Sequence, residues 1–161
     1  MSHVLASRRK RRNRYRGYGP VKTNSQIANE KIFGTHLTLD GYGADSSRLG
    51  DMHLVFKSLD ELPGLLKMKK ITTPYVVYHP GNNKKDSGGY SGFVMIAESH
   101  ISVHTFPKNR FVSIDVYTCR EGMDTGFVAS YFKRVFDLKA VEKHFIIRGA
   151  KYPVDDIYTV K

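Results

Sequence analysis

Residues 93–105, Phe-Val-Met-Ile-Ala-Glu-Ser-His-Ile-Ser-Val-His-Thr, decide the fold that this sequence predicts. Four apolar, β-prone residues open the stretch. Polar and apolar side chains then alternate from His100 to His104, as in a strand with one buried and one solvent-exposed face. Taken alone, the pattern indicates only serines and histidines on the exposed face of a strand. Ser99 and His104 are separated by an odd number of residues, so a regular strand places them on opposite faces, and they meet only through a bend, a chain break or a neighbouring strand.

Outward from this stretch, the same criteria predict a sheet of six strands and two helices. Alternating patterns and turn residues indicate strands at 33–40, 74–79, 91–97, 99–105, 110–119 and 140–149, a turn at 41–43 and a polar loop at 82–89. Asp45 can cap a helix that runs through Leu59 and that Pro63 ends or breaks. Asp124 begins a second helix, which has an apolar stripe over 127–136.

Runs of strands interrupted by two helices predict an α+β fold. We expect an antiparallel sheet with helices on one face, forming a two-layer sandwich. Two helices are too few to cover both faces of six strands. The sheets of two copies are therefore expected to face each other in a homodimer.

The net charge of +11 is concentrated at the N-terminus. Residues 1–30 contain eight of the 26 lysines and arginines but only one of the 15 acidic residues. With few apolar residues, this segment is expected to be a disordered basic arm that precedes one domain over 31–161. The arm fits either a solubilising tail that binds polyanions weakly through residues 8–16 or the RNA-binding segment of a non-catalytic dimer. In the second case Tyr15 and Tyr18 would stack on bases.

The single cysteine, Cys119, excludes an internal disulfide and favours a reducing cytoplasm. No apolar run approaches the roughly 18 residues of a membrane helix. The N-terminus lacks the apolar segment of a secretory signal peptide. By composition alone, Cys119 fits a small buried residue at the end of a strand.

Several short motifs, in register over residues 33–136, resemble the prokaryotic S-adenosylmethionine decarboxylase proenzymes. They comprise Gly34-Thr35-His36-Leu37 with Asp40, Tyr42 and Gly43, and then Ser91, Glu98-Ser99-His100, His104-Thr105, Pro107 and Asp115-Val116-Tyr117-Thr118-Cys119. Each motif alone is weak evidence, but together their spacing favours this family. The resemblance implies a self-cleaving decarboxylase of polyamine and spermidine biosynthesis over residues 31–161. It also implies a symmetric dimer with active sites near the interface.

The resemblance implies that the chain is cut between Glu98 and Ser99 and that Ser99 becomes a pyruvoyl cofactor. This group would form a Schiff base with the substrate in place of pyridoxal phosphate, and no metal is expected. His104 would act in processing, Ser91 would assist by hydrogen bonding to the reacting carbonyl, and Cys119 would donate the proton to the product. A serine hydroxyl is a weak nucleophile, but the chain holds it beside the Glu98 carbonyl at high effective concentration. An unprocessed relative that regulates an active partner subunit remains an alternative.

The residues after His104 depart from the family pattern. Adenosylmethionine-specific members commonly read His-Thr-Trp-Pro-Glu, whereas this chain has Phe106 and Lys108 at the positions of the Trp and the Glu. Phe106 can still stack on an adenine. The Lys108 ammonium has only donors and cannot accept hydrogen bonds from ribose hydroxyls. The resemblance makes S-adenosylmethionine the first expected substrate, and the departure at Lys108 leaves L-arginine or L-ornithine with the same cofactor as the alternative.

Overall fold

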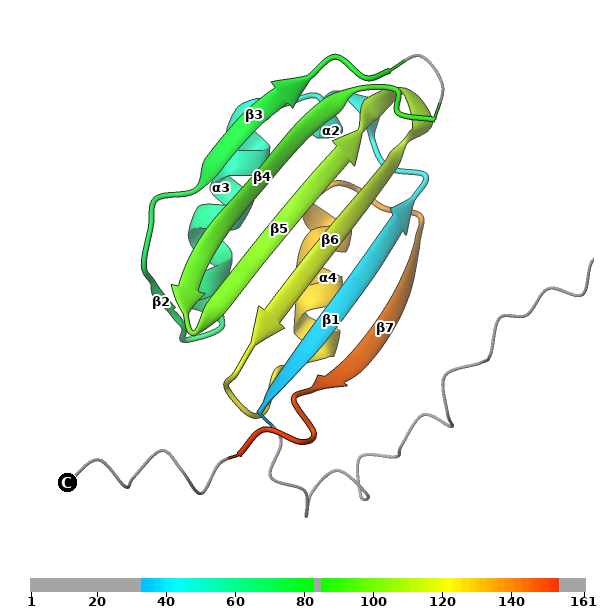
Figure 1. The fold of residues 1–161 in the computed structure, drawn as a ribbon. Coiled ribbons are helices and arrows are strands. Elements are labelled where there is room, and N and C mark those ends of the chain that lie inside the picture. The colour runs from blue at the N-terminus through cyan, green and yellow to red at the C-terminus, as the bar shows by residue number, and fades with distance from the viewer. Residues whose placement is uncertain (1–32, 83–84, 154–161) are drawn as a thin grey trace, which may run out of the picture. The chain divides into compact units, whose positions relative to one another are not determined.

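The computed structural model describes residues 33–82 and 85–153, so the predicted basic arm over 1–30 lies outside the described residues. The described part contains one antiparallel sheet of seven strands (Figure 1): β1 Gly34–Tyr42, β2 Lys69–Lys70, β3 Tyr75–His79, β4 Gly89–Ala97, β5 Ser99–Phe106, β6 Phe111–Thr118 and β7 Ala140–Arg148. The strand order is β2-β4-β5-β6-β1-β7, and β3 also pairs with β4. The predicted α+β class is confirmed. The short β2 was not predicted, because two exposed lysines carry no alternating pattern.

The helices are α2 Ser46–Leu49, α3 Met52–Leu65 and α4 Thr125–Val135, with a 3₁₀ turn, η1, at Pro107–Asn109. The prediction of one helix from Asp45 to Leu59 was wrong, because Asp45 and Asp51 each cap a separate helix with their side-chain oxygens. Pro63 does not end α3. It lies near the C-terminal end of the helix, where it removes only one ladder hydrogen bond, and its side chain is buried. No helix in the described ranges is long and apolar enough to cross a membrane.

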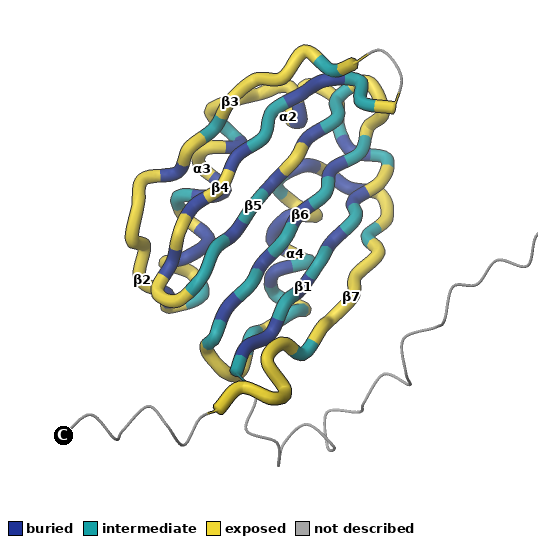
Figure 2. Tube along the Cα trace, viewed as in Figure 1, coloured by how far each residue is buried: buried dark blue, intermediate teal, exposed yellow. Residues whose placement is uncertain are grey.

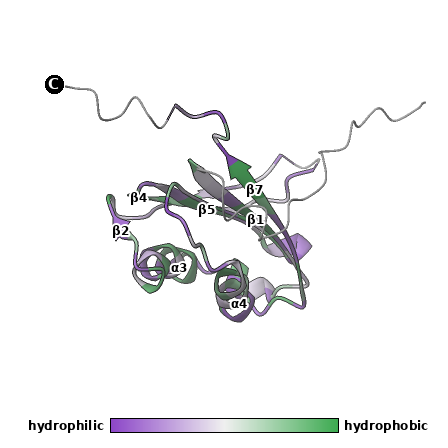
Figure 3. Ribbon diagram, turned by 90° about the horizontal axis from the view of Figure 1, so that it is seen from below, coloured by the Kyte–Doolittle hydropathy of each residue, from purple (hydrophilic) through white to green (hydrophobic). Residues whose placement is uncertain are grey.

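Helices α3 and α4 lie side by side on one face of the sheet (Figure 3). Alternate residues of the central strands point toward them and are fully or almost fully buried: Leu37 and Leu39 of β1, Ile101 and Val103 of β5, and Ile114 and Val116 of β6. The helices contribute Val55, Leu59, Leu62, Val128 and Phe132 to the same core. A one-residue slip in any strand would turn its apolar set away from the helices, so this burial fixes the register.

The opposite face of the sheet carries no helix among the described residues, and its strands alternate between buried and less buried positions (Figure 2). The open-face residues combine polar groups with large exposed apolar side chains, namely Tyr75, Val77, Phe93, Met95 and Ile146. Phe93, for example, leaves 45 % of its surface exposed. Exposed apolar side chains gathered on one sheet face are typical of an interaction surface.

Candidate active site

Ser99 lies at a tight turn between β4 and β5, with Glu98 as the connecting residue. The carbonyl oxygen of Glu98 accepts a hydrogen bond from the backbone N–H of Cys119, at an N···O distance of 3.3 Å. Ser99 has φ of 129°, in a region that non-glycine residues rarely adopt. Such backbone conformations concentrate at functional sites. The hairpin thus brings together the predicted cleavage bond and the one cysteine of the chain.

Cys119 is half-buried, just after the end of β6, and Tyr117 is its polar neighbour. Burial raises the pKa of Tyr117 above its usual value, and the adjacent Cys119 thiol raises it further through charge and hydrogen bonding. The guanidinium of Arg148 lies over the Tyr117 ring, 4.9 Å from its centroid. Its positive charge offsets part of this increase in the pKa of Tyr117. The phenol therefore keeps its proton at neutral pH and can donate a hydrogen bond to the sulfur.

Arg148 also belongs to a hydrogen-bonded chain across the open face. Its guanidinium donates to Nδ1 of His36 at 3.2 Å, and Nε2 of His36 lies 3.0 Å from the carboxylate of Asp115. Because Nδ1 accepts, the ring proton must lie on Nε2, where it is donated to Asp115. Ser102 donates to the other carboxylate oxygen at 3.4 Å.

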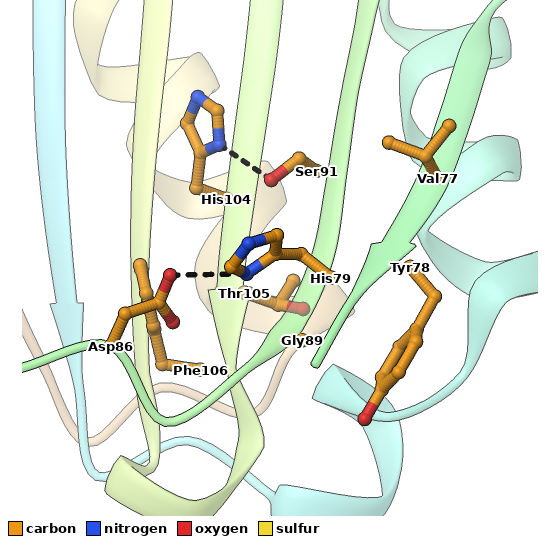
Figure 4. Close-up of a pocket in the computed structure, with 9 residues that line it drawn as sticks. All are labelled: Val77, Tyr78, His79, Asp86, Gly89, Ser91, His104, Thr105 and Phe106. Atoms are coloured by element: carbon orange, nitrogen blue, oxygen red, sulfur yellow. Dashed lines mark hydrogen bonds and ion pairs between the residues drawn. The ribbon is translucent and has the colours of Figure 1, made fainter. Parts of the chain in front are cut away.

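A second group of polar side chains lies near the other end of β4 and β5. Ser91 and His104 face each other across the two strands, and Nδ1 of His104 lies 2.9 Å from Oγ of Ser91. Both contribute to a pocket with a volume of about 380 Å³ (Figure 4). The other lining residues are Val77, Tyr78, His79, Asp86, Gly89, Thr105 and Phe106.

Within one chain, Ser99 at the hairpin does not meet the pair formed by Ser91 and His104. Ser99 pairs with Ile96 and Thr118, whose side chains are fully buried on the helix side. His104 lies on the open face, so the prediction that odd spacing separates them is confirmed. β5 continues from Ser99 to His104 without a break, and five residues of strand span roughly 16 Å.

Two further residues, Phe106 and Lys108, were predicted to bind the substrate. Phe106 lines the pocket, whereas Lys108 lies in η1 and is absent from the pocket lining. The sequence argument did not assign roles to Tyr117, Asp115, His36, Arg148 or Asp86 at the site. Alternation in the predicted strands already placed Asp115 and Tyr117 on one face. Their partners come from β1 and β7, which only the pairing of strands distant in sequence brings alongside.

Among the residues that the structure describes, no three His, Cys, Asp or Glu side chains are close enough together to hold a metal ion. The hairpin offers the Ser99 hydroxyl and the imidazole of His100, whose Nδ1 lies 3.4 Å from Ser99 Oγ, and Cys119 after β6 adds a thiol and a backbone hydrogen bond to Glu98.

Comparisons with known proteins show the family to which the chain belongs. The family model for S-adenosylmethionine decarboxylase matches residues 35–149. An S-adenosylmethionine decarboxylase proenzyme of Clostridium botulinum (strain Langeland) is 31% identical over 119 residues, which cover 74% of this chain and 97% of that protein. The proenzyme of Thermoplasma volcanium is 29% identical over 116 residues, covering 72% and 84% of the two chains.

The fold is also shared with a solved structure. The crystal structure of the adenosylmethionine decarboxylase from Aquifex aeolicus superposes with a TM-score of 0.62 and 25% identity, covering 73% of this chain and 92% of the other. Fold and relatives together define a pyruvoyl-dependent carboxy-lyase. The chain belongs to the S-adenosylmethionine decarboxylase family, which acts in polyamine biosynthesis.

Proposed function

We propose that this chain cleaves itself between Glu98 and Ser99, forms a pyruvoyl group at residue 99 and decarboxylates S-adenosylmethionine for spermidine synthesis. The observation that carries the proposal is the hydrogen bond from the Cys119 N–H to the Glu98 carbonyl oxygen. That oxygen gains negative charge when the carbonyl is attacked, and a fixed N–H donor stabilises the charge. The single cysteine favours the reducing cytoplasm as the place of the reaction.

The cleavage needs only groups of the chain and water. Ser99 Oγ bonds to the Glu98 carbonyl carbon, the C–N bond breaks, and the hydroxyl proton ends on the nitrogen, which leaves an ester. A base then removes the Cα proton of residue 99, the C–O bond breaks and Glu98 departs as a carboxylate. The remaining enamine becomes an imine, and water hydrolyses it to the ketone and ammonia. The left-handed φ of Ser99 stores backbone strain that cleavage releases.

The pyruvoyl group supplies an electron sink that lets carbon dioxide leave from an α-amino acid. We assign the return of the proton to Cys119, a half-buried cysteine whose backbone N–H donates to the carbonyl oxygen of Glu98, the residue before Ser99. Tyr117, protonated at neutral pH, orients the sulfur by hydrogen bonding. On the open face, the guanidinium of Arg148 packs on the Tyr117 ring. Arg148 is in turn hydrogen-bonded to His36, and His36 to Asp115. The proposal requires neither a metal nor pyridoxal phosphate.

We further propose that His104 and Ser91 act on the hairpin of a second copy of the chain. In one chain His104 is too far from Ser99 along a continuous strand to reach it. A two-fold axis that lies between two facing sheets and runs across their strands would bring the hairpin end of one sheet over the pocket end of the other. The exposed Phe93, Met95 and Tyr75 would be buried by the same contact.

Purified protein tests the proposal directly. On a denaturing gel we expect two pieces, residues 1–98 and 99–161, and the second should resist Edman sequencing because its N-terminus is a ketone. Carbon dioxide release should then be compared for S-adenosylmethionine, L-arginine and L-ornithine. An intact single band would contradict self-processing. A preference of more than about tenfold in kcat/KM for a basic amino acid would change the substrate and keep the cofactor chemistry.

Lys108→Glu should increase kcat/KM for S-adenosylmethionine by about tenfold or more, because a carboxylate can accept hydrogen bonds from the ribose hydroxyls and an ammonium cannot. L-arginine and L-ornithine, which have no ribose, should show no such gain. The measurement is carbon dioxide release from all three substrates with the wild type and the variant. An unchanged kcat/KM for S-adenosylmethionine would remove Lys108 from the substrate site.

A further inference from the structure

We propose that Asp86 determines substrate specificity: its carboxylate accepts hydrogen bonds from the donor-rich end of the substrate, remote from the carboxyl group that is lost. This inference rests on the proposed function and adds the group that recognises the substrate. Two chemistries present such an end, the vicinal hydroxyls of a ribose and the terminal cation of a basic amino acid. Both offer donors that a carboxylate can pair with its two oxygens.

The position of Asp86 in the pocket carries the proposal. Among the described residues that line the pocket, Asp86 is the only carboxylate, and it shares the cavity with Ser91, His104 and Phe106. Figure 4 shows Asp86 on the loop between β3 and β4, on the same side of the cavity as Phe106. A ligand whose reacting end lies near His104 and whose ring lies on Phe106 would therefore bring its remaining polar groups toward Asp86.

The local structure holds the Asp86 side chain in place. Its Oδ1 accepts the backbone N–H of Gly88 at 2.8 Å. Its Oδ2 lies 3.2 Å from Nδ1 of His79, a nitrogen that itself accepts the backbone N–H of Gly81 at 3.0 Å. The Asp86 backbone is tied to Asn82 at both its N–H and its C=O. The Asp86 side chain is 33 % exposed, so a ligand in the pocket can reach it. A carboxylate held before binding loses less entropy when a ligand arrives.

The first residue of β4, which follows this loop, packs closely against β5. A Cβ atom at Gly89 would lie 1.9 Å from the Thr105 carbonyl oxygen, so only glycine allows the two backbones to approach this closely. Pro107, two residues after Thr105, begins η1, which contains Lys108, and Lys108 is not among the residues that line the pocket. The β3–β4 loop thus supplies the carboxylate of Asp86 to the pocket. The strand β5, which also lines the pocket, continues instead into η1 and Lys108.

The test measures binding with two probes that lack an α-amine and so cannot react with a ketone. The first is 5′-methylthioadenosine, which has a ribose and no cation. The second is n-butylguanidine, which has a cation and no ribose. Calorimetric titrations would compare the wild type with Asp86→Asn, Asp86→Ala and the control Glu61→Gln, which removes one negative charge from the exposed surface of α3.

Both Asp86 variants should weaken one probe by about tenfold to a hundredfold, the range expected for hydrogen bonds to a charged group. Loss of 5′-methylthioadenosine binding identifies the ribose as the partner, and loss of n-butylguanidine binding identifies the cation. Glu61→Gln should bind both probes as the wild type does. The proposal would be overturned if Asp86→Asn bound both probes as tightly as the wild type does. It would also be overturned if Glu61→Gln lost as much binding as the Asp86 variants, or if the wild type bound neither probe.

The same titrations in a Ser99→Ala background separate this inference from the proposed function. That variant cannot form the ketone, so a difference in probe binding between chains with and without the Asp86→Asn substitution reports recognition alone. A wild type that stays uncleaved would defeat the proposed chemistry and leave the binding result standing.

Discussion

Ser99→Ala is expected to leave the chain in one piece and without decarboxylase activity. The hydroxyl is the only atom group removed, and without it no ester can form at Glu98. Ser99 is half-buried at the start of β5, and its Oγ has only a long contact of 3.4 Å to Nδ1 of His100, so the fold should survive the change. Intact mass spectrometry and circular dichroism measure the two effects separately.

Ser102→Ala is the matched control, because Ser102 is a serine of the same strand whose Oγ contacts Asp115 instead of the hairpin. It should be cleaved as the wild type is. Cleavage after Glu98 in Ser99→Ala would eliminate the proposed mechanism. Unfolding of Ser99→Ala together with normal cleavage of Ser102→Ala would show that the hydroxyl is needed for structure, and Ser99→Thr, which retains a hydroxyl, would then be expected to restore both folding and cleavage.

Co-expression of Ser99→Ala with His104→Ala should restore activity that neither variant has alone. If His104 acts on the partner's Ser99, a mixed dimer contains one site with both residues intact and one site with neither. Random pairing makes half of the dimers mixed, so activity should return to roughly a quarter of the wild-type value. Mass spectrometry of chains with different tags should find cleavage only in the His104→Ala chain.

Cys119→Ala provides the contrast for this experiment. Cys119 is hydrogen-bonded through its backbone to Glu98 of the same chain, so co-expression of Cys119→Ala with Ser99→Ala should not restore decarboxylation. Alone, Cys119→Ala should still be cleaved but decarboxylate poorly, because proton return follows cofactor formation, whereas His104→Ala should be blocked in cleavage. Absence of restored activity with the His104→Ala pair, although mixed dimers form, would mean that each chain builds its own site.

Much of the fold was predictable from local patterns. The period of two in residues 99–106 and 111–118 determines which side chains face the core, because successive residues of a strand point to opposite faces. The apolar stripe of α4 and its Asp124 cap were equally clear. The division of the first helical region at Gly50 was less so, since the two capping aspartates, Asp45 and Asp51, also fit one helix.

The sequence by itself determined the β-rich class and the buried faces, and the spacing of its motifs, by resemblance to a known family, predicted the group formed by Glu98, Ser99, His104 and Cys119. These depend on residues close in sequence or on a spacing that can be compared directly. Only the tertiary structure decided that Ser91 pairs with His104, that Arg148 and His36 support Tyr117, and that Asp86 enters the pocket. Each of these contacts depends on strand register or loop packing, which follow from burial summed over the whole sheet and are not encoded in any one segment.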